Sequence, residues 1–330
     1  MRKTYISAFI GLLVGIGLIF VWLQFVDFSE VTSLFSTVTW KYVIYSGIFY
    51  LLAYFIRSLR WNLLLRIRHK VSIVSTYMYC LAGNLINYLI PIRAGEVAKP
   101  FLLKKREGIA VTESFPSVII DKFFDTIGIF VVLVLIPFLS IELSKALVIL
   151  LVILIALFAL GLLTLVLLSL KPNEMTKFLY KVMFFIPSKF KDKVMASLGR
   201  FVEGMTVLAD NKLSIIPLIL LTLVGVLCDA VYFYLIFLAF GINIGFTMVL
   251  FGYTLINLSY ALPQTPAQIG TNEWMMSLIF YAGFGILDMN VAAAIMAFAH
   301  IYTAIILITS GSIALGYTGN GLLEIFKRRR

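Results

Sequence analysis

The stretch NYLIPIRAGE, from Asn87 to Glu96, decides how this chain folds. It lies within a mostly apolar segment, yet it contains Pro91, Gly95 and two opposite charges. Proline and glycine favour the end of a helix and a tight turn. The stretch therefore predicts a polar turn between two short helices, inside an apolar helix bundle.

The composition of the whole chain defines the class of protein around this turn. Of its 330 residues, 62% are hydrophobic and only 13% are charged, whereas soluble domains carry roughly 25% charged residues. The chain is therefore expected to be a polytopic membrane protein. Its net charge of +11 comes from basic residues gathered in a few loops, which is the pattern of cytoplasmic loops. Such loops attract anionic lipid headgroups, and no nucleic-acid partner is expected.

Six segments are long and apolar enough to cross a bilayer. They are residues 5–26, 41–57, 123–141, 145–170, 213–240 and 289–316. Basic residues precede the first span, follow the second and fill the loop 171–212, whereas the connections near 27–40, 142–144 and 241–247 contain no Lys or Arg. This alternation predicts a multi-pass protein of the cell membrane, with a cytoplasmic loop at 171–212 and both termini in the cytoplasm.

Two further apolar segments, 72–92 and 248–287, do not fit as single spans. The first has basic residues at both flanks, and the second is interrupted by Pro263, Pro266 and Gly270. The halves of the second segment are too short to span a bilayer. Both are therefore predicted to be re-entrant hairpins, whose broken backbone must face protein or a watery cavity.

The order of these segments predicts an inverted repeat within one transmembrane domain, residues 1–330. The fold class is all-α, with six full transmembrane helices plus two re-entrant helical hairpins, and the halves are about 1–141 and 142–317. The spacing from Pro91 to Glu96 resembles that from Pro266 to Glu273. An alternative with three full spans over 248–316 leaves the C-terminus on the same side of the membrane, and it stays open.

The candidate binding residues are polar groups at membrane depth, which are costly and therefore indicate function. Arg93 offers a planar fork for phosphate, beside a helix expected to begin near Glu96. These two residues, with Asn87 before them, are predicted to bind a lipid headgroup. A salt bridge between Arg93 and Glu96 is the alternative.

Two more carboxylates are candidate binding groups. Glu273 follows a break and either caps the next helix or acts as a cavity carboxylate that meets a cationic headgroup or carries a proton. Asp229 lies in the middle of a span, where no capping role is available. Its alternative is a hydrogen bond to a neighbouring Tyr or backbone group.

Asp121 and Asp125 are spaced to share one helix face, which favours a cationic partner. We expect a gating or ion-pair network with Arg93 or Lys99, and helix capping is the alternative. Arg57, Arg60 and Trp61, in the sequence RSLRW, are expected to anchor the end of their span at the membrane interface. A second contact to phosphate is the alternative for this group.

No motif typical of an enzyme, nucleotide site or metal site occurs in the sequence. The only histidines are His69 and His300, and the only cysteines, Cys80 and Cys228, lie in apolar segments. We expect no enzymatic activity, no cofactor and no metal. Aspartate chemistry by Asp121 and Asp125 stays open, without a specific feature in its favour.

Four motifs in order resemble a known family. RSLRWNLLL, NYLIPIRAGEVAKPFLLKKREGI, VIIDKFFDTIGI and PQTPAQIGTNEW are similar to the lysylphosphatidylglycerol synthase transmembrane family, the flippase-like domain of the multiple peptide resistance factor. The resemblance implies a lipid translocase with two re-entrant turns. It assigns to these turns and to the adjoining acidic motif Asn87, Pro91, Arg93, Gly95, Glu96, Asp121, Asp125, Pro266, Gly270 and Glu273.

The chain also differs from the family pattern. It has PAQIG in the second turn, where a glycine-richer PGGIG type is expected, and it ends in KRRR without a soluble aminoacyl-transferase domain. The predicted function is a flippase for a phosphate-bearing (glyco)lipid or aminoacyl-phospholipid, with membrane lipids as partners. The alternatives are a membrane lipid or glycolipid transferase and a non-transporting partner of a separate lipid synthase. A homo-oligomer is possible on this reading.

Overall fold

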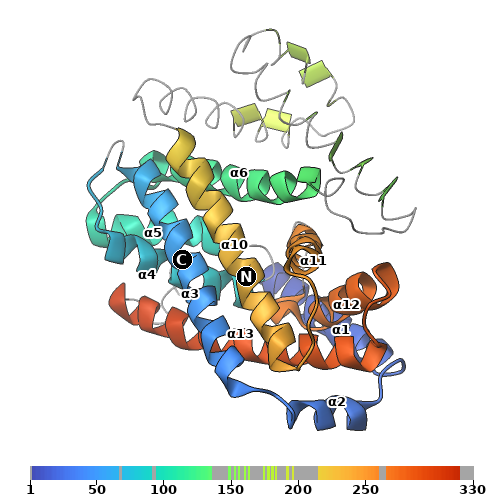
Figure 1. Ribbon diagram of the computed structural model, residues 1–330. Coiled ribbons are helices and arrows are strands. Elements are labelled where there is room, and N and C mark those ends of the chain that lie inside the picture. Colours follow the sequence, from blue (N-terminus) through green and yellow to red (C-terminus); the bar gives the residue numbers. More distant parts are fainter. Residues whose placement is uncertain are drawn as a thin grey trace.

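The computed structural model of the protein describes residues 2–66, 69–90, 94–135, 215–259 and 265–319, with scattered residues between 148 and 196 (Figure 1). All regular elements in these ranges are helices, and no strand occurs among them. The all-α fold class is therefore confirmed. Most of the fourth predicted span, 145–170, and of the loop 171–212 lies outside the described residues.

Within the described ranges, three helices are long and apolar enough to cross a membrane: α3 (Trp40–Leu65), α10 (Ile215–Ala239) and α13 (Met289–Tyr317). They coincide with the predicted spans 41–57, 213–240 and 289–316, except that α3 continues through RSLRWNLLL to Leu65. α1 (Arg2–Trp22) and α6 (Val111–Leu135) cover most of the first and third predicted spans. α6 is not one of the three because three charged residues, Asp121, Lys122 and Asp125, lie in its middle.

A short helix occupies the connection between the first two predicted spans. α2 (Phe28–Phe35) begins after Asp27, whose carboxylate accepts hydrogen bonds from the backbone N–H groups of Ser29 and Glu30 at 2.9 and 3.2 Å. Such a cap satisfies N–H groups that have no partner within the helix. α2 packs against α13, and a hydrogen bond of 2.9 Å from the Asp27 N–H to the Asn290 side chain joins the two.

The first helix pair consists of α4 (Ile73–Leu89) and α5 (Ala94–Glu107), which pack against each other. The break between them falls within NYLIPIRAGE, as predicted, and Pro91 and Arg93 lie outside the described residues. The segment 72–92 was expected to hold the complete hairpin. It forms only the first arm, because a second helix of 14 residues follows the break.

The second helix pair consists of α11 (Phe246–Ser259) and α12 (Thr271–Met276), with a 3-10 turn, η3 (Pro266–Gln268), before α12. α12 continues directly into a π-helical stretch, η4 (Ser277–Gly283). Gly270 precedes α12 with φ of +80°, and a Cβ there would lie 2.6 Å from the carbonyl oxygen of Gly15 in α1. The second break therefore requires glycine at this position. Pro263 lies outside the described residues.

The long helices α3 and α10 pack side by side along most of their length (Figure 1). α13 runs across them, and it contacts α4 of the first helix pair and α12 of the second. α6 contacts α5 on one side and α11 on the other. α4 also contacts the turn η3, so the first helix pair and the second break lie close together, beside the polar residues described below.

Candidate functional site

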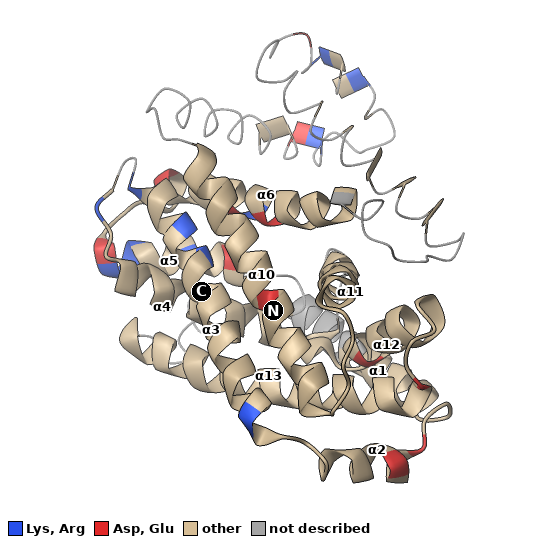
Figure 2. Ribbon diagram, viewed as in Figure 1, with Lys and Arg blue, Asp and Glu red and all other residues tan. Residues whose placement is uncertain are grey.

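A cavity of about 510 Å³ lies among α3, α4, α5, α6, α10, α11, α13 and the second break. Among the described residues, four cationic and four anionic side chains line it: Arg57, Arg60, Lys99, Lys122, Glu96, Asp121, Asp125 and Asp229. The formal charges of these eight residues cancel. In Figure 2, charged segments interrupt otherwise uncharged stretches of α6 and α10. A balanced set of charges inside an apolar bundle is costly unless each is paired.

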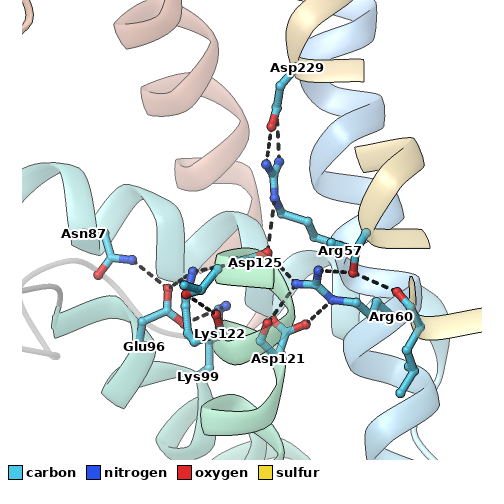
Figure 3. Close-up of polar contacts among 12 residues, drawn as sticks. Arg57, Arg60, Asn87, Glu96, Lys99, Asp121, Lys122, Asp125 and Asp229 are labelled. Carbon is cyan, nitrogen blue, oxygen red and sulfur yellow. Dashed lines mark hydrogen bonds and ion pairs between the residues drawn. The ribbon is translucent and has the colours of Figure 1, made fainter. Parts of the chain in front are cut away.

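Arg60 is the most enclosed of these cations, at 1% exposure. Its Nε atom lies 2.8 Å from Asp121 Oδ1, and its Nη2 atom lies 2.5 Å from Asp125 Oδ1 (Figure 3). A third bond, of 2.9 Å, reaches Thr222 on α10. The two aspartates on one face of α6 therefore do have a cationic partner. Arg60 on α3 contacts both, and Lys122 also lies 2.9 Å from Asp125. Lys99 pairs with Glu96, and any contact of Arg93 lies outside the described residues.

Arg57, one turn before Arg60, pairs with Asp229. Its two terminal nitrogens face the two carboxylate oxygens of Asp229 in a fork, with Nη1 and Oδ1 3.3 Å apart. Its Nε atom also lies 3.8 Å from Asp125 Oδ1. Paired forks of this kind are strong and directional. Asp229 is thus held by an arginine of α3, a partner that the sequence did not indicate.

Arg60 and Trp61 of the RSLRW group are buried inside the protein, and the interfacial position of the group stays a prediction. Trp61 is 0% exposed, and its indole N–H donates to Ser117 Oγ on α6 at 2.9 Å. Lys99 Nζ lies 5.6 Å from the centre of the Trp61 ring, within range of a cation–π contact. Arg60 and Trp61 are interior residues because α3 continues as a helix and α6 and α10 pack on this face.

The first break is stabilised around Glu96. Its carboxylate lies 2.9 Å from Lys99 Nζ and 3.0 Å from Lys122 Nζ, and it accepts a bond of 3.1 Å from Asn87 (Figure 3). The Asn87 side chain also accepts a bond of 2.7 Å from the Gly95 N–H. Lys122 bridges Glu96 to Asp125 at 2.9 Å, so the first helix pair joins the ion-pair network of α6.

Gly95 is required by close packing in this pair. A Cβ at Gly95 would lie 1.8 Å from the carbonyl oxygen of Gly83 on α4. No side chain fits at this distance, so the start of α5 touches the backbone of α4 directly. The prediction that Gly95 belongs to a tight turn therefore has a steric reason. The contact of Arg93 with Glu96 or with a ligand falls outside the described residues.

The second break is stabilised around Glu273. One carboxylate oxygen accepts the Gly270 N–H at 2.8 Å, and the other lies 2.6 Å from His300 Nδ1 on α13. Glu273 therefore caps α12, as one of its two predicted roles requires. It stands behind the cavity wall, whereas His300, Gln268 and Asn272 line the cavity. Its role as a headgroup ligand stays a prediction.

Three site residues were missed by sequence reasoning: Lys122, Thr222 and His300. The signal for Lys122 and His300 was present, since each is an ionisable residue inside an apolar helix. Thr222 had no such signal, because a threonine in a membrane helix commonly bonds its own backbone. Here its hydroxyl donates to the Leu218 carbonyl at 2.7 Å and accepts from Arg60.

The helices and their buried charges define an α-helical membrane protein with a polar interior site. The chain belongs to the family described as the lysylphosphatidylglycerol synthase TM region, which matches residues 8–311. The resemblance seen in the sequence is therefore confirmed over nearly the whole chain.

Two archaeal relatives, each named a UPF0104 membrane protein, extend the comparison. The one from Pyrococcus horikoshii is 25% identical over 288 residues, which cover 82% of this chain and 86% of the relative. The one from Methanocaldococcus jannaschii is 23% identical over 326 residues, which cover 96% of both chains. No solved structure gives a significant match. Both relatives are named as membrane proteins, which agrees with the long apolar helices of this chain.

Proposed function

We propose that the protein moves a lipid with a phosphate-bearing headgroup between the two leaflets of the cell membrane. One observation carries this proposal: a cavity of about 510 Å³, whose described lining includes four cations and four carboxylates, lies inside an apolar helix bundle. A headgroup is polar and its tails are apolar, so a path for it needs a polar interior beside lipid. Membership of a family named for a lipid synthase agrees with a lipid as the substrate.

Two of the four cations are accessible to a phosphate. The side chains of Lys122 and Arg57 are 37% and 24% exposed, whereas those of Lys99 and Arg60 are 8% and 2% exposed. A phosphate that enters the cavity would compete with carboxylates for Lys122 and Arg57. Lys99 and Arg60 would hold the carboxylates in place behind them.

The exposed carboxylates suit the second part of an aminoacyl headgroup. Asp125 and Glu96 have side chains that are 24% and 16% exposed, and both contact Lys122. If a phosphate pairs with Lys122, both carboxylates lose part of their ion pair with this lysine. An ammonium group on the same headgroup would compensate for this loss. The paired charges therefore favour a headgroup that carries both signs.

The packing of the helices supports an inverted 4+4 repeat with two re-entrant pairs. In this scheme α3 corresponds to α10, α4 to α11, α5 to α12 and α6 to α13. The contact of α3 with α4 then corresponds to that of α10 with α11, and the contact of α4 with α13 corresponds to that of α11 with α6. The contact of α5 with α6 corresponds to that of α12 with α13. Motion of one half against the other would give alternating access, with both termini cytoplasmic.

Purified protein in liposomes tests this function. Fluorescent phosphatidylglycerol, an aminoacyl-phosphatidylglycerol and a phosphate-free glucosylceramide are placed in both leaflets, and the outer pool is bleached by a membrane-impermeant reductant. We expect the protein to accelerate exchange of the two phospholipids over protein-free liposomes and to leave the glucosylceramide unchanged.

Other outcomes lead to other functions. If no lipid of the panel moves faster than in protein-free liposomes, the transport proposal is wrong. A new lipid product in the same liposomes, detected by mass spectrometry, would favour a membrane transferase. Co-purification with a lipid synthase, without either activity, would favour a non-transporting partner.

A further inference from the structure

His300 joins the two helix pairs at the wall of the cavity. It lies on α13, and its side chain is 10% exposed. One ring nitrogen, Nδ1, faces Glu273 of α12 at 2.6 Å. The other, Nε2, lies 2.8 Å from the Ala267 carbonyl oxygen in η3 and 3.2 Å from the Tyr88 hydroxyl in α4. Tyr88 stands just before the first break, and Ala267 lies in the second.

The hydrogen-bond partners of the His300 ring determine how many protons the ring must carry. A carboxylate and a backbone carbonyl only accept hydrogen bonds, so the bonds to Glu273 and Ala267 together need a proton on both ring nitrogens. A neutral imidazole carries one proton. With that proton on Nδ1, toward Glu273, the bare Nε2 accepts a hydrogen bond from the Tyr88 hydroxyl instead. Nε2 of the protonated ring therefore bonds Ala267 in the second break, whereas Nε2 of the neutral ring bonds Tyr88 of the first helix pair.

The backbone at the second break is suited to such a change. Ala267 and Gln268 have φ values of +52° and +59°, in the left-handed region that residues with a Cβ rarely adopt. Such a conformation persists only while surrounding contacts hold it. The bond from His300 to Ala267 is one of these contacts. Gln268, the next residue, lines the cavity and accepts a bond of 3.0 Å from Asn272.

We propose that His300 and Glu273 form a proton-binding site that couples proton movement to lipid movement. This inference rests on the proposed transport function and names its coupling ion. A proton taken up from the water on one side of the membrane forms the Nε2–H bond, and on release it passes to the water on the other side, with no other covalent bond formed or broken. Its binding fixes the second break through Ala267, and its loss frees that turn and the cavity residues beside it.

Among the described residues, two titratable groups contact the ring. Glu273 comes from α12 and Tyr88 from α4, while η3 contributes only the uncharged carbonyl of Ala267. Lysines and arginines of the described cavity wall pair with the other carboxylates, as given above. A histidine changes charge between about pH 5 and pH 8, so a pH gradient across a membrane can drive the step.

Liposomes with a pH gradient and a clamped membrane potential test the coupling. For the wild-type protein we expect the initial rate of fluorescent phosphatidylglycerol movement to differ between gradient and no gradient. In His300→Gln the ratio of the two rates should fall to one. His69→Gln, at the other histidine of the chain, should keep the wild-type ratio. Lipid movement with a wild-type ratio of one would overturn the coupling and leave the transport function standing.

A spectroscopic measurement covers the case in which His300→Gln does not fold. In His69→Gln, labelled with ¹⁵N-histidine, His300 gives the only imidazole signals. We expect a doubly protonated ring at about pH 5 that converts to the Nδ1–H form by about pH 8. One unchanging neutral form over this range would overturn the proposal, whatever the transport assay shows.

Discussion

The two helix pairs place a glutamate at the same position but hold it with different partners. Glu96 is the third residue of α5, and Glu273 is the third residue of α12. Two lysines and an asparagine surround Glu96. A backbone N–H and a histidine surround Glu273. Lysine stays charged at neutral pH, whereas histidine titrates there. The first turn therefore has fixed electrostatics, and the second has electrostatics that a proton can change.

Substitution of Arg60 should have the largest effect on this comparison, because the fixed charges near the first pair depend on it. Arg60→Ala leaves the buried Asp121 without its cationic partner and removes one of the cations that contact Asp125. Breaking a buried pair in this way costs about 3–5 kcal/mol. We expect a lower thermal unfolding temperature in detergent and a smaller folded fraction. Arg66→Ala, at the exposed end of α3, is the control. Equal losses in the two variants would contradict the central role of Arg60.

A methyl group at Gly95 should separate the arms of the first pair. The Cβ would lie 1.8 Å from the Gly83 carbonyl, and overpacking of this kind costs about 1–3 kcal/mol. In Gly17→Ala the added Cβ meets nothing within 4 Å, so that helix should be unchanged or stabilised. Thermal unfolding of both variants checks the difference. A Gly95→Ala protein as stable as wild type would show that α4 and α5 are not in direct backbone contact.

Replacing each glutamate in turn tests the comparison itself. Glu96→Gln weakens contacts to two permanent cations, so its loss of stability, about 1–3 kcal/mol, should be similar at about pH 6 and pH 8. Glu273→Gln weakens a contact to an imidazole. Its loss should be larger at about pH 6, where the ring is charged, and smaller at about pH 8. Unfolding curves at both pH values measure this. The same pH dependence in both variants would remove the distinction between the two turns.

Substitution of Asn87 should have the smallest effect on stability, because its side-chain amide is uncharged. Asn87→Ala removes its bonds to the Gly95 N–H and to Glu96, at 2.7 and 3.1 Å, and we expect a loss of about 1 kcal/mol. Asn243→Ala, on an exposed connection, is the matched control. A loss above that of Gly95→Ala would mean that the side chain, rather than close backbone packing, holds the first turn.

The pattern of apolar residues predicted the long helices well, but it did not predict which buried polar side chains contact one another. The bounds of α10 and α13 follow from continuous apolar runs with polar ends, which is local information. The ion pair of Arg57 with Asp229 and the bond of Arg60 to Thr222 join residues far apart in the chain. Such pairs depend on how α3 packs against α10, and one sequence does not specify that.

The second turn shows the same division between local and long-range information. The capping role of Glu273 follows from its spacing after Gly270, and that alternative is confirmed at 2.8 Å. The contact with His300 depends on the path of α13 past η3, so it was not predicted. The single ionisable residue in an apolar helix was nevertheless a usable signal.

The most direct measurement of the central claim compares lipid movement by two lysine variants in liposomes. Lys122 lies in the cavity wall, and Lys104 is exposed near the end of α5. If Lys122 binds a headgroup phosphate during movement, Lys122→Gln should lower the initial rate about tenfold, the effect of roughly 1.4 kcal/mol. Lys104→Gln should keep the wild-type rate. Equal rates for correctly folded Lys122→Gln and Lys104→Gln would contradict passage of the headgroup through this cavity.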